Sequence, residues 1–360
     1  MKILERYIVK TMAFYVLAVL FIWLCVYGFL NFINEVDDIG VANYTTLKAM
    51  IYVAMDLPAV AYSHSSMIIL LGSLLAFGHL SSTSQLIIAR ASGLSILQIA
   101  QIVVKAALFF AFIIIIFGEL VVPISTQSAE GQRKKALGIN IMAENQQGFW
   151  LKDGDFIINV KENFDGKFFK DIMLINTKKL QQLDEIIQAQ RAVFDGENLH
   201  LEKIKRYKLN YDNGFVGFKY QPQSNWTAKV SFDRSLINGL EKEPYELSTW
   251  NLYQQIDFLT NNNLIASAFE VEFYKRLVRP ITLATMILFS LLFVFGSLRD
   301  ASMGRNIFIG LVISLCFELI SRIGGVLSLR FDYNHAVTAF LPTLIALVLV
   351  LYFLRMKSSQ

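Results

Sequence analysis

Long uncharged apolar segments constrain this 360-residue chain more than any other feature of its sequence. A segment of about 20 apolar residues is long enough to cross the hydrocarbon core of a bilayer. Four segments of roughly this length or longer contain no Asp, Glu, Lys or Arg: Thr11–Asn34, Leu57–Leu80, Pro280–Leu298 and Ala336–Leu354. Charged residues make up only 17% of the chain, against roughly 25% in a typical soluble domain. The chain is therefore expected to be an integral membrane protein.

Two more apolar segments are interrupted by a pair of charges each: Gly93–Val122 by Lys105 and Glu119, and Asn306–Leu327 by Glu318 and Arg322. Including them gives six predicted membrane helices, in two groups of three. The first segment is too long for the apolar part of a signal peptide, and no small-residue cleavage site follows it before NEVDD. It is therefore expected to remain as a membrane helix.

Basic residues in the short connecting segments set the expected orientation, because cytoplasmic segments are enriched in Lys and Arg. They gather on one side of the predicted spans: Lys2, Arg6, Lys10, Arg90, Arg299, Arg305, Arg355 and Lys357. The acidic stretch NEVDD after the first span lies on the opposite side. Both termini are therefore expected in the cytoplasm, and the long segment between the third and fourth spans outside it.

That long segment, residues 123–267, has the alternating pattern of β-strands. Five stretches show it: GDFIINVKEN, FKDIMLINTKK, NLHLEKIKRYKLN, GFVGFKY and WTAKVSF. Turn signals with Asp-Gly or Asn-Gly lie at KDGD, FDGK, FDGE and YDNG. Short strands joined in this way predict a β-sandwich or jelly roll. A helix predicted over Glu246–Asn263 leads back to the membrane.

The expected architecture is an α-helical integral membrane protein with an inserted all-β domain. Residues 1–122 hold spans 1–3 with a cytoplasmic segment near 80–92, residues 123–267 form the β-jelly-roll-like domain, and residues 268–360 hold spans 4–6.

Sequence motifs of an ATPase or hydrolase are missing from the chain. There is no Walker A pattern (G-x-x-x-x-G-K-[ST]), no H-E-x-x-H and no G-x-S-x-G. Cys25 and Cys316 lie in apolar segments and are expected to be small core residues, not a disulfide or metal pair. The net charge of +4 comes with membrane-flanking basic residues, not with a nucleic-acid-binding patch. We therefore expect no catalytic residue, metal or cofactor in this chain, and no nucleic-acid partner.

Charged and polar residues inside the predicted spans are candidates for function. Glu318 and Arg322 lie four residues apart, on one face of a helix, and are expected to pair. Such a pair fits two roles: locking the helix against a neighbour, or lining a polar cavity that a charged ligand crosses. His64, between Ser63 and Ser65, fits a hydrogen-bonded contact between helices better than a proton site.

Six motifs follow one another along the chain: LERYIVKT, QLIIARASGLS, GELVVP, QQGFWLKDG, EVEFYKRLVRP and FVFGSLRDASMG. With three spans on either side of a β domain, this order resembles the lipopolysaccharide-export permeases, the LptF and LptG proteins. QQGFWLKDG and the G-x-LR-x-x-x-MG pattern at 296–304 are more similar to the LptG members. The resemblance extends over nearly the whole chain.

The resemblance implies that the segment between spans two and three is a coupling helix lying against an LptB-like ATPase dimer, which binds the ATP. Its implied contact residues are Gln85, Leu86, Ile87, Arg90 and Gly93. Gln85 stands where LptG-like proteins commonly have an acidic residue, so a hydrogen-bonding group remains but a charge is lost. Without the resemblance, an ordinary cytoplasmic turn would explain the segment.

The resemblance also implies lipid contacts at Arg133, with Lys134 and Lys135 beside it, and at Arg276. Glu318 and Arg322 are further candidates for lipid contact because they are charged residues inside a predicted span. A basic triplet such as 133–135 is otherwise typical of a solvated or headgroup-facing turn. Family members often have lysines after the first span, where this chain has Asp37 and Asp38. Those carboxylates could attract phosphate only through a bridging divalent ion.

The implied function is that of a permease subunit of an ABC transporter in the bacterial inner membrane, which extracts lipopolysaccharide towards a periplasmic β-jelly-roll bridge. Its implied partners are an LptF-like permease, an LptC-like single-span protein and an LptA-like bridge. One alternative is a transporter driven by an ion gradient, with His64, Asp56 and the Glu318–Arg322 pair as proton relay. Another is a structural anchor for an envelope assembly.

Overall fold

The computed structural model describes most of the chain, in two compact units. The described residues are 2–85, 88, 91, 96–138, 149–164, 167–176, 185–212, 215–230, 232, 237, 239, 242–262, 264–295, 303–331 and 333–358. One unit combines Met1–Arg133 with Glu270–Gln360, and the other is Lys134–Phe269. Each of these units has its own hydrophobic core.

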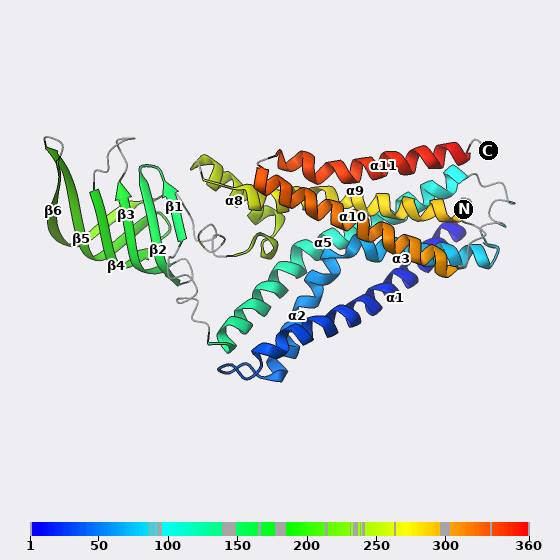
Figure 1. Ribbon diagram of the computed structural model, residues 1–360, viewed down its shortest axis with the longest axis horizontal. Coiled ribbons are helices and arrows are strands. Elements are labelled where there is room, and N and C mark those ends of the chain that lie inside the picture. The colour runs from blue at the N-terminus through cyan, green and yellow to red at the C-terminus, as the bar shows by residue number, and fades with distance from the viewer. Residues whose placement is uncertain are drawn as a thin grey trace. The chain divides into compact units, whose positions relative to one another are not determined.

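The first unit is built from long helices (Figure 1). They are α1 (Lys2–Glu35), the short 3-10 helix η1 (Val36–Asp38), α2 (Thr46–Ser63), α3 (Ser65–Ser82), α5 (Ile96–Ala136), α9 (Ser267–Phe295), α10 (Met303–Phe331) and α11 (His335–Ser358). Among the described residues, five helices are long and apolar enough to cross a membrane: α1, α3, α5, α10 and α11. Their length and composition fit a membrane protein.

Helix α9, which corresponds to the expected fourth span, is not among those five. Its first half carries Lys275, Arg276 and Arg279, and the end of the expected span at 296–298 lies outside the described residues. The count of six spans therefore stays a prediction.

The second expected span differs from the prediction of one helix over Leu57–Leu80. The structure has two helices there, and the only non-helical residue between them is His64. Backbone hydrogen bonds nevertheless continue through the junction: His64 N donates to Val60 O, and Ile68 N donates to His64 O, both at 3.0 Å. The junction is thus a bend, and α2 extends the helical segment back to Thr46.

The core of the helical unit lies around α3, which contributes the longest run of buried residues. The N-terminal half of α1 packs on α3 through Ile8, Met12 and Val16. A Cβ added at Gly72 of α3 would lie 2.6 Å from the Val16 Cα, so only glycine permits this close approach. Cys25 and Cys316, expected as core residues, are instead exposed and free, because α1 and α10 bury only part of their surface.

The second unit contains six antiparallel strands in a meander. They are β1 (Phe149–Asp153), β2 (Phe156–Phe164), β3 (Phe168–Asn176), β4 (Glu185–Phe194), β5 (Asn198–Asp212) and β6 (Phe215–Lys229), hydrogen-bonded in sequential order. A sandwich or jelly roll needs two sheets with crossing connections, whereas the described strands form one sheet of neighbours. The prediction of antiparallel strands is confirmed, although β5 and β6, with 15 residues each, are longer than expected. The jelly-roll-like arrangement stays a prediction.

One face of this sheet and helix α8 (Thr249–Asn261) enclose the second core. Register places buried residues opposite one another, as in Ile158 with Leu174 and Leu174 with Ile187. The predicted helix over Glu246–Asn263 is confirmed by α8, which Ser248 caps by accepting a hydrogen bond from Asn251 N at 3.2 Å. Helix α5 continues through Pro123 to Ala136, so helical structure reaches further than the expected boundary at 122.

Candidate functional site

The expected coupling segment lies largely outside the described residues: Leu86, Ile87, Arg90 and Gly93 are not described. Gln85 is helical, and its amide oxygen is buried without a hydrogen-bond partner in the described part of the chain. Ile88, one turn further, is 64% exposed. The coupling role of the segment stays a prediction.

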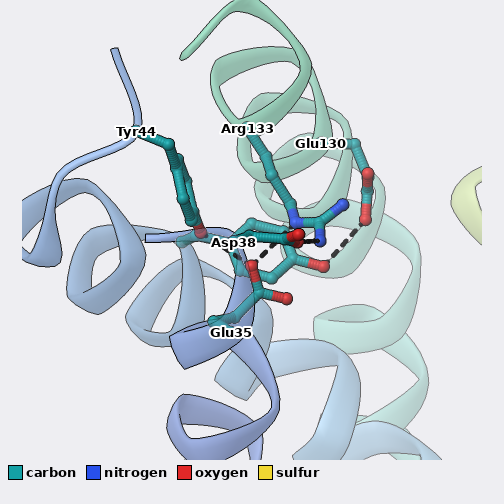
Figure 2. Close-up of polar contacts among 6 residues, drawn as sticks. Glu35, Asp38, Tyr44, Glu130 and Arg133 are labelled. Carbon is teal, nitrogen blue, oxygen red and sulfur yellow. Dashed lines mark hydrogen bonds and ion pairs between the residues drawn. The ribbon is translucent and has the colours of Figure 1, made fainter. Parts of the chain in front are cut away.

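Arg133, expected to meet lipid phosphate, instead contacts two carboxylates from the end of α1 and from η1 (Figure 2). Its Nε donates to Glu35 Oε2 at 2.8 Å, and its Nη2 donates to Asp38 Oδ2 at 2.5 Å. The Glu35 side chain is only 11% exposed, which keeps water from competing for this pair. Arg133 therefore bonds to two carboxylates at once and links α5 to residues almost 100 positions earlier in the sequence.

Two tyrosines complete this arrangement. Tyr44, which is fully buried, donates its hydroxyl to Glu35 Oε2 at 2.8 Å. Tyr52 of α2 donates to Glu130 Oε1 at 2.9 Å, and its ring lies 5.3 Å from the Arg133 guanidinium carbon. The six residues Glu35, Asp38, Tyr44, Tyr52, Glu130 and Arg133 are called the Arg133 cluster below.

The tyrosine hydroxyls of the cluster remain donors at any physiological pH. Burial, and then the hydrogen bond to Glu35, raise the pKa of Tyr44 well above its ordinary value. Burial and the nearby Glu130 carboxylate raise the pKa of Tyr52 in the same way. Both neutral hydroxyls therefore stabilise the ionised carboxylates they face.

Arg276, the other expected basic contact, is buried on α9 beside two carboxylates. Its Nε lies 3.3 Å from Glu272 Oε1, and its Nη1 lies 3.8 Å from Glu119 Oε1 on α5. One turn along α9, the Arg279 guanidinium stacks 3.9 Å from the centroid of the Tyr62 ring and donates to the Tyr62 carbonyl at the end of α2. Both arginines thus join α9 to neighbouring helices.

The expected Glu318–Arg322 ion pair is confirmed, with 3.0 Å between Glu318 Oε1 and Arg322 Nε. The Arg322 side chain is 60% exposed, so the pair lies on the surface of α10. The His64 ring lies tilted against Trp23 and Tyr27 of α1, with ring centroids 5.5 and 4.9 Å apart. His64 therefore makes a contact between helices, while the expected hydrogen bond stays a prediction.

Asp37 and Asp38 lie in the short 3-10 helix η1 that follows α1. Among the described residues, no group of three or more His, Cys, Asp or Glu side chains is arranged to hold a metal ion. Asp38 is instead engaged by Arg133. Lys134 and Lys135 follow Arg133 on the last turn of α5, and Lys135 is exposed.

Comparison with known proteins decides the family. The profile of the lipopolysaccharide export system permeases LptF/LptG matches residues 6–356. The chain belongs to the LptF/LptG family. Two similar curated proteins are the lipopolysaccharide export system permease protein LptG of Escherichia coli strain K12, 26% identical over 358 residues and 99% of both chains, and that of Haemophilus influenzae, 26% identical over 356 residues and 98% of both chains.

The sequence does not predict the Arg133 cluster as a unit, although it draws attention to Arg133 and Asp38 separately. Tyr44, Tyr52 and Glu130 are ordinary polar residues in the sequence, and Glu35 stands out there only as part of the acidic stretch NEVDD. One local signal exists: Glu130 and Arg133 are three residues apart and share a helix face. Their partners on α1 and α2 come from distant sequence, which no local pattern reveals.

Proposed function

We propose that this chain is the LptG-type permease subunit of an ATP-driven transporter that extracts lipopolysaccharide from the bacterial inner membrane. The observation that carries the proposal is the family match over residues 6–356. Both termini would lie in the cytoplasm and the sheet unit in the periplasm, as the distribution of basic residues predicts. The chain would hydrolyse no ATP itself; a separate LptB-like dimer would do so.

In this proposal the segment containing Gln85, Arg90 and Gly93 receives the movement of the ATPase. An LptF-like permease would form the other half of the lipid cavity. The exposed apolar side chains of α1, such as Phe14, Phe21 and Phe29, would face acyl chains. Lys134 and Lys135 would meet phosphate at the rim, and the Glu318–Arg322 pair would line the path. The buried Arg276 would contribute by joining α9 to α5.

The sheet unit would pass the lipid to LptC-like and LptA-like proteins. Its meander leaves β1 and β6 as edge strands. An edge strand with unpaired backbone groups can extend into a second sheet by strand addition. This supports a handover between similar β domains.

The test is reconstitution of the chain with its ATPase and second permease in vesicles that contain lipopolysaccharide. We expect ATP-dependent release of the lipid to a soluble β-domain acceptor, and loss of release in Arg90→Glu with assembly intact. Arg6→Glu is the matched control, since it also reverses a cytoplasmic arginine but lies outside the coupling segment.

Two results would contradict the proposal. The first is a chain that purifies without an ATPase and moves no lipid when ATP is supplied. The second is lipid movement that follows an imposed proton gradient and disappears in His64→Ala, which would favour the gradient-driven alternative.

A further inference from the structure

The two halves of α1 are attached to the rest of the helical unit in different ways. In the N-terminal half, Ile8, Met12 and Val16 are buried in the hydrophobic core, and Trp23 is the last residue that packs against it. Among the described side chains, no residue of α1 beyond Trp23 belongs to that core. The C-terminal half instead packs on α2, with Gly28 against Leu57, so its attachment to α5 needs other contacts.

Polar contacts provide this attachment. Asn31 Nδ2 donates to Asp56 Oδ2 of α2 at 3.3 Å. Glu35, the last residue of α1, accepts from Arg133 Nε of α5 and from Tyr44 on the same oxygen, each at 2.8 Å. Asp38 accepts from the other end of the same guanidinium. The planar guanidinium thus bonds two points at the end of α1, which fixes its direction as well as its distance.

The charge balance of the Arg133 cluster opposes a phosphate ligand. Three carboxylates, Glu35, Asp38 and Glu130, accompany one guanidinium (Figure 2). A phosphate could reach Arg133 only by displacing two carboxylates that already bond to it, and by entering a site of net negative charge. Like charges at such short range repel one another, most strongly at Glu35, whose side chain is only 11% exposed.

We propose that Arg133, Glu35 and Asp38 form a clamp that positions the C-terminal half of α1 on α5, and that Arg133 is a positioning residue, not a phosphate ligand. Tyr44 holds Glu35 in place from the side of the chain that leads to α2. The clamp rests on the proposed function in one respect: if α1 lines the lipid path, the clamp sets the width of that path. Headgroup phosphate is then left to Lys134 and Lys135.

The test measures the distance between spin labels on the two helices in the full chain. The labels replace exposed Asn34 of α1 and Ile124 of α5 in a background with both native cysteines changed to serine. The chain is placed in lipid nanodiscs without nucleotide or partner proteins. We expect one narrow distance distribution in the unmodified cluster.

Variants on both sides of the clamp give the decisive comparison. Arg133→Gln and the double change Glu35→Gln/Asp38→Asn are expected to broaden the distribution towards longer distances to the same extent. Arg133→Lys keeps the charge but cannot bond both carboxylates in the fork geometry, so an intermediate broadening is expected. Lys10→Gln is the control: it also removes one positive charge, from an exposed site at the other end of α1, and is expected to leave the distance unchanged.

A second readout separates the clamp from a ligand role. In nanodiscs doped with bis-phosphorylated lipid A, the clamp predicts no gain in lipid retention for Glu35→Gln/Asp38→Asn. A phosphate ligand would be freed by that change, so retention would rise there and fall in Arg133→Gln; this result, or unchanged distances in both variants, would overturn the proposal. The distances need no transport, so a failure of the proposed function would leave them unaffected.

Discussion

The N-terminal half of α1 is held by packing in the hydrophobic core, whereas the end of its C-terminal half is attached to α5 by ion pairs. Met12 and Val16 fit against α3, where Gly72 allows the backbones to approach closely. Glu35 and Asp38, at the other end, reach a single arginine on α5. Salt does not screen core packing, but it does screen ion pairs that are partly exposed. One helix therefore combines an end packed in the core, the fixed end, with an end attached by ion pairs, the releasable end.

The largest expected loss of stability comes from placing a side chain between α3 and the N-terminal half of α1. Gly72→Leu places side-chain atoms where Val16 backbone lies 2.6 Å from the added Cβ, so α1 and α3 must separate. Overpacking in a core typically costs about 1–3 kcal/mol, and a backbone obstacle puts this change at or above that range. The measurement is the melting temperature of the detergent-solubilised chain.

Gly131→Ala on α5 serves as the control for that change. Nothing lies within 4 Å of a Cβ added there, and alanine favours a helix over glycine by up to about 1 kcal/mol. We expect an unchanged or slightly raised melting temperature. A drop equal to that of Gly72→Leu would show that helix glycines matter generally and that the Val16 contact is not special.

A smaller loss of stability is expected when a buried side chain in the N-terminal half of α1 is shortened. Met12 is fully buried, and Met12→Ala leaves a cavity; such changes cost about 2–5 kcal/mol in soluble proteins. The lower part of that range is expected in a membrane, where the transfer contribution is weaker. Phe29→Ala, a larger truncation at a site 65% exposed on the same helix, is expected to cost less. Equal decreases in melting temperature for Met12→Ala and Phe29→Ala would contradict the difference between the two halves of α1.

Removal of one hydroxyl tests the releasable end. Tyr44→Phe leaves the buried Glu35 carboxylate with one donor fewer, and a lost hydrogen bond to a buried charged group costs about 1.5–3 kcal/mol. We expect broader distances between labels at 34 and 124, with little change in the α1–α3 contact. Tyr7→Phe, at an exposed site of α1, is the control and is expected to be neutral.

The smallest expected effect is that of salt. The screening length falls from about 10 Å at 0.1 M to about 3 Å at 1 M ionic strength, and the Arg133 side chain is 23% exposed. High salt is expected to broaden the 34–124 distances slightly. Labels at exposed Phe14 and Leu108 report the fixed end and are expected to show no change. A salt response at both label pairs would indicate a global loosening.

Features encoded over a few residues could be predicted from the sequence. The Glu318–Arg322 pair follows from helical spacing, and its 3.0 Å distance confirms it. The FDGE turn between β4 and β5 also forms as expected: Gly196 has a φ of +113°. Asp195 accepts hydrogen bonds from the backbone nitrogens of Glu197 and Asn198, which lowers its pKa below the ordinary carboxyl value.

Other elements were missed for identifiable reasons. Strand β4 reads EIIQAQRAVF, and its alanines are poor strand formers. It forms a strand because it pairs with β3 and β5 on either side. The stretches GFVGFKY and WTAKVSF were predicted as separate strands, whereas β6 continues between them through Pro222. Proline is tolerated there because β6 is an edge strand.

The candidate site was the least predictable part. The bend at His64 has no proline or glycine at the junction, and Pro58 lies six residues earlier within α2. Glu35 and Arg133 meet across 98 residues of sequence. In the sequence, Arg133 stands in a basic triplet that suggests a free positive charge, and only the folded chain supplies the carboxylates that occupy it.

The length of helix α5 determines how far one of its ends moves when the other end tilts. Its 41 residues extend for about 62 Å at 1.5 Å per residue, roughly twice the thickness of the hydrocarbon core. It begins directly after the expected coupling segment and carries Arg133 near its other end. A tilt of about 5° at one end of such a lever arm displaces the far end by about 5 Å, more than the length of an ion pair. If the proposed ATPase rotates the start of α5, and the helix stays straight through Pro123, a small rotation there is enough to part Arg133 from Glu35.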